Sequence, residues 1–211
     1  LVVILIFSSE VFPAQRALIQ KASAQGYLTP TVNTYGNAWD GILAFGVNNY
    51  LVIMRTNGTL LSMRTGGTGY GVAKNIAQDQ LLFQGEPQTT LGANTAPIYA
   101  THIWNIVSNI TQDYPNVLGH HDIEYDPIGN TFLTLQEYVR QVGNNSILFD
   151  KIVEVDTSGN VLWSWDTYDH IPLSQASPFN ETSVIGGQTV IDFTHSNALL
   201  WEPSNNIIYL N

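Results

Sequence analysis

Four segments of this chain share one pattern, in which a β-prone run, a short turn and a second β-prone run follow one another. The turns are rich in Asn, Asp and Gly, which tolerate the backbone angles of tight hairpins. In the first segment the Asn-Gly dipeptide at 57–58 predicts a type I′ turn. Hairpins of this kind require neighbouring strands to bury their apolar side chains, so they predict an all-β fold. The four segments are residues 50–64, 122–135, 151–165 and 198–210.

The recurrence of the turn motif itself, and not only of strand length, favours a β-propeller, whose blades repeat about every 40 residues. The alternative is an antiparallel sandwich or meander, which also has short strands and regular turns. A blade has about four strands, so these segments supply about three blades, and a closed ring needs at least four. We therefore expect a partial propeller over residues 27–211 that continues beyond Asn211.

The first 26 residues differ from the rest and form a predicted N-terminal region. Residues 1–7 are an apolar run that predicts a buried strand, with the end of a signal peptide as the alternative. Such a strand could also pair with a sheet of another subunit, which would make residues 1–7 a self-assembly segment. Residues 9–26 predict a short helix, with Pro13 near its first turn and Gly26 at its end.

Composition excludes several classes of partner. The formal net charge is −10 and only seven Lys and Arg are spread along the chain, which excludes a phosphate-backbone partner such as nucleic acid. The chain has no cysteine, so it has no disulfide, thiolate zinc site or thiol nucleophile. The hydrophobic content of 44% supports a packed core.

Low charge and abundant Asn, Ser and Thr favour an extracellular or otherwise extracytoplasmic protein. Sequons for N-glycosylation add to this expectation, because each lies where a turn or loop would expose it. Attached N-glycans are therefore expected at the sequon asparagines, which are Asn57, Asn109, Asn144 and Asn180.

Three of the five histidines lie in two short segments, 119–127 and 192–197, each with an acid nearby. Histidine changes charge near neutral pH, so this arrangement indicates proton or group transfer. His120 has a simpler reading as a turn clamp, because adjacent strand residues point to opposite faces. The same argument counts against a metal ion bound by His120, His121, Asp122 and Glu124, and no metal site is predicted.

Four blocks of sequence, in this order and spacing, resemble the arylsulfotransferase (ASST) family over about residues 100–211. They are residues 120–130, 150–165, 169–172 and 192–197. The resemblance implies a six-bladed propeller with the catalytic site in its central channel. It implies transfer of a sulfuryl group from a small phenolic sulfate ester to a phenol acceptor, without a nucleotide donor or other cofactor. The route is ping-pong through a sulfated histidine.

Carried onto this sequence, the resemblance assigns catalytic roles to His121 (with His120 as the alternative), His195 and Asn197. It places the family's essential arginine and its sulfuryl-accepting histidine after Asn211. The charge on a transferring sulfuryl group requires hydrogen-bond donors, which the two histidines could supply. Asn197 could hold an oxygen or fix a histidine tautomer. Asp122 and Asp192 could orient the rings, and His170 is expected in a loop near the channel mouth.

Two functions follow from these observations. The first is a secreted enzyme of the arylsulfotransferase type. The alternative is a catalytically lapsed propeller that serves as a glycosylated extracellular assembly or filament subunit, because a fold alone does not carry function.

Overall fold

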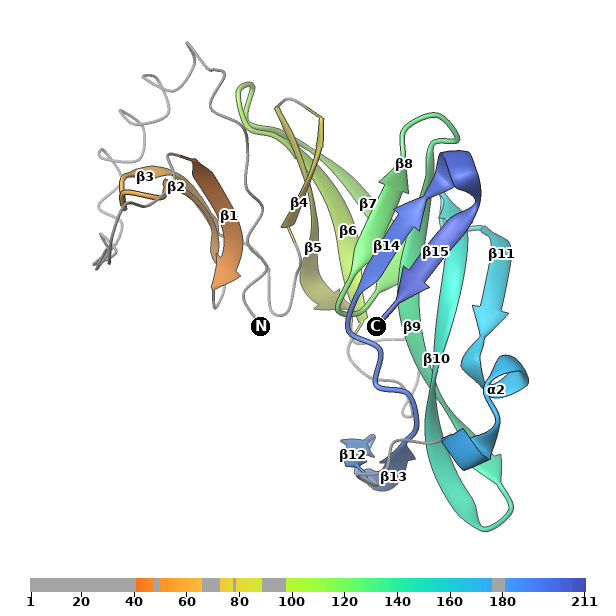
Figure 1. Ribbon diagram of the computed structural model, residues 1–211. Helices are drawn as coiled ribbons and strands as arrows, with labels where there is room; N and C mark the ends of the chain where they lie inside the picture. Colours follow the sequence, from red (N-terminus) through yellow and green to blue (C-terminus); the bar gives the residue numbers. More distant parts are fainter. Residues whose placement is uncertain (1–40, 48–49, 66–72, 78, 89–97, 176–180) are drawn as a thin grey trace. The chain divides into compact units, whose positions relative to one another are not determined.

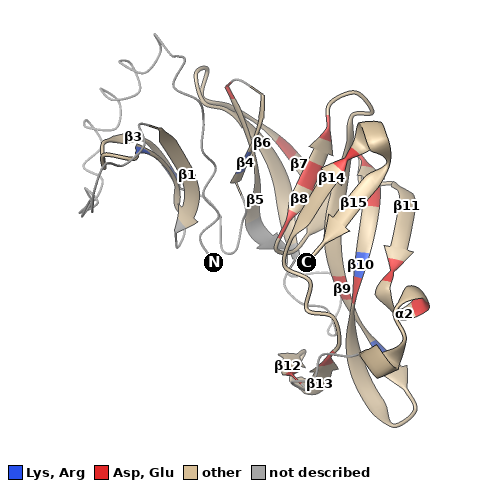
Figure 2. Ribbon diagram, in the orientation of Figure 1, with Lys and Arg blue, Asp and Glu red and all other residues tan. Residues whose placement is uncertain are grey.

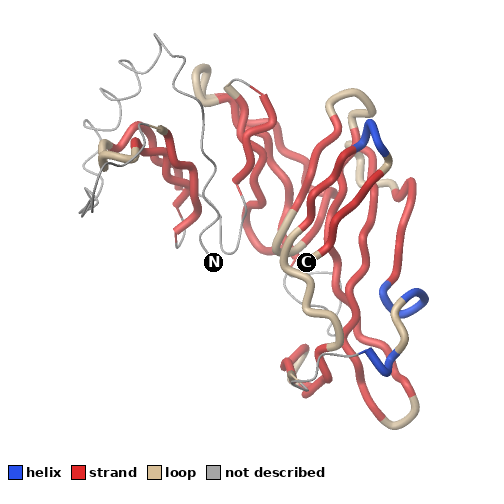
Figure 3. The backbone as a smooth tube through the Cα atoms, in the orientation of Figure 1, coloured by secondary structure: helices blue, strands red, loops and turns tan. Residues whose placement is uncertain are grey.

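The computed structural model describes residues 41–47, 50–65, 73–77, 79–88, 98–175 and 181–211, and in these residues the chain is all-β (Figure 1). The described helices are one α-turn, α2 (Thr167–His170), and the short 3-10 turns η1 (Leu173–Gln175) and η2 (Pro203–Asn205). Figure 3 shows how little of the described backbone is helical. The predicted strand 1–7 and helix 9–26, with the boundary at residue 26, lie outside the described residues. The all-β prediction is confirmed, and the propeller arrangement stays a prediction.

The chain divides into two compact units, one of Leu1–Glu86 with His102–Gln112 and one of Pro87–Thr101 with Asp113–Asn211. The first contains a three-stranded antiparallel sheet of β1 (Ile42–Val47), β2 (Tyr50–Arg55) and β3 (Leu60–Thr65). The predicted hairpin 50–64 is confirmed as β2–β3. The inner faces of these strands pack into a core with Leu51, Ile53, Phe83 and Trp104.

The type I′ turn predicted for this hairpin is wrong. Within this turn only Gly58 has a positive φ, of 89°, whereas a type I′ turn requires a positive φ at both central residues. The loop is longer, with Arg55 N donating to Thr59 O at 2.8 Å, and the Asn57 side chain accepts from Thr59 N at 3.0 Å. The register of β2 on β3 also shifts at Ile53 and Met54, so a bulge takes up the extra residue.

A four-stranded sheet follows in sequential order, from β4 (Ala73–Ala77) and β5 (Gln80–Gln88) to β6 (Ile98–Asn105) and β7 (Ile110–Gly119). His102 on β6 stacks on Phe83 with ring centroids 5.0 Å apart. A side chain at Gly85 would meet this ring, because its Cβ would lie 2.2 Å from His102 Nε2. His102 is therefore a packing residue.

The second unit contains another sequential run of four antiparallel strands, namely β8 (Ile123–Asp126), β9 (Thr131–Val142), β10 (Asn145–Asp156) and β11 (Val161–Asp166). The hairpin β12 (Thr182–Ile185) and β13 (Gln188–Asp192) joins the sheet, because β13 pairs in parallel with β10 at Leu148. A buried cluster of Ile147, Phe149 and Phe193 anchors the segment that follows β13.

The other three predicted hairpins are confirmed as β8–β9, β10–β11 and the pair β14 (Leu199–Glu202) and β15 (Ile207–Leu210). Each turn has one residue at positive φ, namely Asn130 at 54°, Gly159 at 86° and Asn206 at 58°. Asp156 accepts hydrogen bonds from the backbone of Ser158 and Asn160, and Asp126 caps its own turn in the same way. The repeated acid is thus part of the turn.

Candidate active site

Two bends bring the histidine-rich segments together in the second unit. His121 follows β7 with a φ of 56°, and His195 follows β13 with a φ of 48°. Left-handed backbone at residues other than glycine is uncommon, and it concentrates at functional sites. The His121 and His195 ring centroids lie 6.4 Å apart, and those of His120 and His121 lie 4.8 Å apart.

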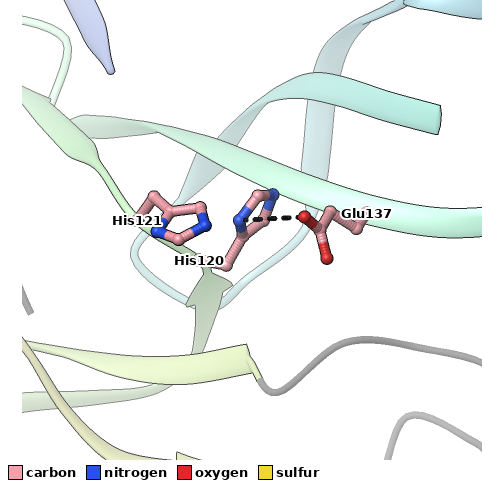
Figure 4. Close-up of side chains that lie close together, drawn as sticks. All are labelled: His120, His121 and Glu137. Carbon is pink, nitrogen blue, oxygen red and sulfur yellow. Dashed lines mark ion pairs between the residues drawn. The ribbon is translucent and has the colours of Figure 1, made fainter. Parts of the chain in front are cut away.

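The structure corrects the premise that His120 and His121 lie in a strand and point to opposite faces. The two residues lie in a bend and not in a strand, so their side chains converge (Figure 4). Ligand atoms of His120, His121 and Glu137 lie within 4.8 Å of one another, as do those of Glu181, Asp192 and His195. Two histidines and a carboxylate are a donor set that zinc accepts, so the argument from opposite strand faces excludes no metal here.

Asp122 connects the first bend to the chain that follows the second. Its carboxylate is buried and accepts from Ile123 N at 2.7 Å and from Leu199 N at 2.8 Å. His120 N also donates to Leu135 O at 2.9 Å, which ties the bend to β9. Through these two backbone amides Asp122 links the first bend to the start of β14.

Asp192 contacts the ring of His195. The His195 Nδ1 atom lies 2.6 Å from Asp192 Oδ2, and the Ser183 hydroxyl donates to the same carboxylate oxygen at 3.1 Å. The hydrogen bond to Asp192 raises the pKa of His195 above its ordinary value, in opposition to partial desolvation. The His195 side chain is 49% exposed, so its ring remains accessible to a ligand.

His121 titrates in the opposite direction. Desolvation, and then the positive charges of His120 and His195, lower the pKa of His121 to about 4. His121 is therefore neutral at pH 7, whereas His195 beside Asp192 favours the protonated form. Titratable neighbours with pKa values driven apart are the pattern from which acid and base roles are assigned.

Glu137 and Asp150 complete the site, and the sequence reading gave neither a role. They are directly opposed on β9 and β10, with the ring of His120 between them. The signal that could have found them is the turn at Gly143, because a hairpin with its tip there pairs residue 137 with residue 150. Asp150 also accepts from the Thr194 hydroxyl and from Ser196 N.

Asn197 lies beside His195, whereas His170 lies against the end of β11. Asn197 is exposed, and its side-chain Nδ2 donates to the His195 carbonyl at 2.8 Å, so it supports the left-handed turn of the histidine. His170 ends α2, where its Nδ1 lies 2.8 Å from Asp166 O and its ring stacks on Trp165 at 4.8 Å. The contacts of His170 are thus with the end of β11.

The family model described as Arylsulfotransferase (ASST) matches residues 102–210. The chain belongs to the arylsulfotransferase family. The match covers just over half of the chain and includes every residue of the candidate site, from His120 to Asn197. Neither the curated proteins nor the solved structures contain a significant match. Membership in the arylsulfotransferase family supports an arylsulfotransferase-like function and implies aryl sulfate and phenol substrates.

Proposed function

We propose that this protein transfers a sulfuryl group from a phenolic sulfate ester to a phenol acceptor, through a sulfated histidine. The observation that carries the proposal is the facing pair of histidines, His121 and His195, inside the region matched by the family. Their rings lie close enough to contact one small anion between them. Their environments also favour opposite protonation states.

The proposed roles follow from these protonation states. In its protonated form, with Nδ1 held by Asp192, His195 presents Nε2–H to an oxygen of the sulfuryl group, where negative charge develops. Neutral His121 accepts the proton of the attacking phenol. Asn197 holds the His195 turn, and its second amide hydrogen would donate to a sulfuryl oxygen.

The transfer proceeds in two half-reactions. The sulfur–oxygen bond of the donor ester breaks while a sulfur–nitrogen bond forms, and the released phenolate takes up a proton from the solvent. The acceptor phenol then loses its proton to His121 as its oxygen forms the new ester and the sulfur–nitrogen bond breaks. In this scheme the histidine that carries the sulfuryl group is neither His121 nor His195.

We also propose that the sheets are blades of a propeller. Two of them support this, because β4–β7 and β8–β11 are each four strands in sequential order, which is the topology of a blade. The parallel contact of β13 with β10 lies at the far end of β10 from the β11 pairing, so it leaves the order β8–β11 intact.

We infer an extracytoplasmic location from composition and from the sequons. The predominance of acidic over basic side chains is visible in Figure 2. Asn57, Asn109 and Asn144 are all exposed, which supports glycosylation, whereas Asn180 lies outside the described residues. Within the described part of the chain, no helix is both long and apolar enough to span a bilayer.

The proposal is tested by incubating the full-length protein with 4-nitrophenyl sulfate and a phenol, and by following the release of nitrophenol. Loss of a donor to the developing charge costs about 100-fold to 1,000-fold in kcat, so His195→Ala should fall by this factor. Asp169→Asn, an exposed carboxylate on α2, is the matched control and should keep full activity. Turnover by His195→Ala within a few-fold of the parent would contradict the assignment.

A further inference from the structure

The carboxylates of Glu137 and Asp150 are directly opposed in the sheet, and both lie close to His120. Glu137 and Asp150 are register partners on β9 and β10, so their side chains leave the same face of the sheet. Both are nearly inaccessible, with side chains 9% and 3% exposed. Like charges in this cross-strand position destabilise a sheet, and burial increases the cost. Some positive charge or proton must therefore lie between them.

His120 lies between the two acids, and Figure 4 shows its contact with Glu137. Its Nδ1 is 3.6 Å from Glu137 Oε1, and its Nε2 is 3.6 Å from Asp150 Oδ1. Neither ring nitrogen has a hydrogen-bond partner among the described residues, and the side chain is 3% exposed. Each nitrogen of a buried imidazole is thus aimed at a carboxylate, just beyond hydrogen-bond distance.

A neutral imidazole has one N–H and one lone pair, so it can satisfy only one of two ionised carboxylates. The remaining lone pair would face the other carboxylate across 3.6 Å, which is repulsive. One extra proton between His120 and Glu137 removes the repulsion, whether it lies on the ring or on the acid. Burial raises the pKa of Glu137, which is in accord with a proton held there.

Asp150 stays the ionised partner and also holds the second histidine segment. Its Oδ2 accepts from the Thr194 hydroxyl and from Ser196 N at 2.9 Å, the residues on either side of His195. Desolvation acts to raise the pKa of Asp150, but His120, the Thr194 hydroxyl and the Ser196 amide outweigh it and leave the pKa below its ordinary value. One carboxylate thus contacts both bends.

We propose that His120, Glu137 and Asp150 form a buried positioning unit, which holds one proton between His120 and Glu137 and fixes the bends that carry His121 and His195. This inference rests on the proposed function only for its catalytic consequence. The titratable groups that face the unit are His121 in the same bend, Asp192 at the end of β13 and His195 in the segment after β13. The unit orients the histidines and does not touch the substrate, so its three members are positioning residues.

The first test is the protonation state of His120 in the full-length protein, measured from its imidazole ¹⁵N shifts at pH 7. We expect Nε2 to carry a proton and Nδ1 to show a strong hydrogen bond or full protonation. A Nδ1 with a free lone pair would overturn the proposal. So would stoichiometric zinc binding that displaces the proton and is lost in Glu137→Gln, because the unit would then be a metal centre.

The second test separates positioning from general stability by kinetics. Displacement of a catalytic group by about 1 Å costs about 100-fold, so Asp150→Asn should lower kcat about 100-fold, change KM little and shift the His195 ¹⁵N resonances. Glu137→Gln should keep most activity, because its amide N–H can donate to His120 Nδ1 as a protonated acid does. Thr194→Val removes one contact of Asp150 and should give an intermediate loss if Asp150→Asn does not fold.

Unchanged kcat and unchanged His195 resonances in both Asp150→Asn and Thr194→Val would overturn the inference. Absence of turnover in the parent protein would instead remove the proposed function, while the ¹⁵N measurements on His120 and His195 would still decide whether the unit exists. The two failures are therefore distinguishable.

Discussion

The two site histidines differ because their neighbours differ, although both lie at left-handed backbone positions. His195 has one strong contact with a buried carboxylate, and about half of its side chain is exposed. His121 is more enclosed and has an imidazole on each side. A neutral imidazole is stable in the second environment and an imidazolium in the first. The difference in protonation is thus a property of packing.

This difference predicts how His121 affects acid stability. Its pKa is about 4 in the folded protein and about 6.5 when unfolded. Between these values the unfolded chain binds the extra proton, so the residue lowers stability as pH falls from about 6.5 to 4. Between pH 7 and pH 4.5 the free energy of unfolding of His121→Gln should therefore fall by about 2–3 kcal/mol less than that of the parent, as measured by urea unfolding.

The difference in free energy of unfolding between parent and variant should not change from pH 7 to pH 8, which provides an internal control. An equal loss of stability in parent and variant on acidification would show that His121 is protonated in the folded state.

Single residues of the site were predictable in part. His121 and His195 could be identified because an acid lies near each in the chain and because their blocks resemble a family. Glu137 could not, since its partner Asp150 is 13 positions away and is opposed only through the β9–β10 register. Proximity across a ladder has no local sequence signal unless the hairpin itself is recognised.

At the scale of elements, the turns were the predictable part. Each predicted hairpin exists because Asn or Gly supplies the positive φ that the turn requires. The strands β9 and β10 extend well beyond the predicted runs, to a tip at Gly143, and the pairing of β13 with β10 joins segments distant in the sequence. Long-range pairing depends on packing of both faces, which a single segment does not reveal.

Two glycines with positive φ allow a matched test of turn packing. A Cβ at Gly159 would lie 2.4 Å from the backbone oxygen of Asn116, whereas one at Gly143 would meet nothing within 4 Å. Gly143→Ala should cost about 1–2 kcal/mol from backbone strain alone. Gly159→Ala should cost a further 1–3 kcal/mol or so, because backbone atoms must move.

Thermal or urea unfolding of both variants measures the difference. Equal destabilisation would mean that β7 does not pass close to the β10–β11 turn, and the packing described for this unit would be incorrect.

At the scale of the whole molecule, composition excluded more than it identified. A net charge of −10 argues against nucleic acid, and the all-β class follows from the hairpins. The arrangement of the sheets depends on contacts between them, for which the sequence has only a repeat period. The family resemblance supplied what the residues alone could not, and the match over residues 102–210 confirms it at family level.

The sequons of the chain predict glycan attachment if the protein passes through a eukaryotic secretory pathway. Asn144 lies exposed at the tip of the β9–β10 hairpin and should be occupied most fully. Asn109 is also exposed, and its Oδ1 accepts from Trp104 Nε1 at 3.2 Å, which leaves the amide nitrogen for the sugar. Secreted protein should lose mass on glycosidase treatment, and Asn144→Gln should remove one glycan without loss of folding. An unchanged mass in the parent would contradict the glycans and would remove the support that the sequons give to an extracellular location.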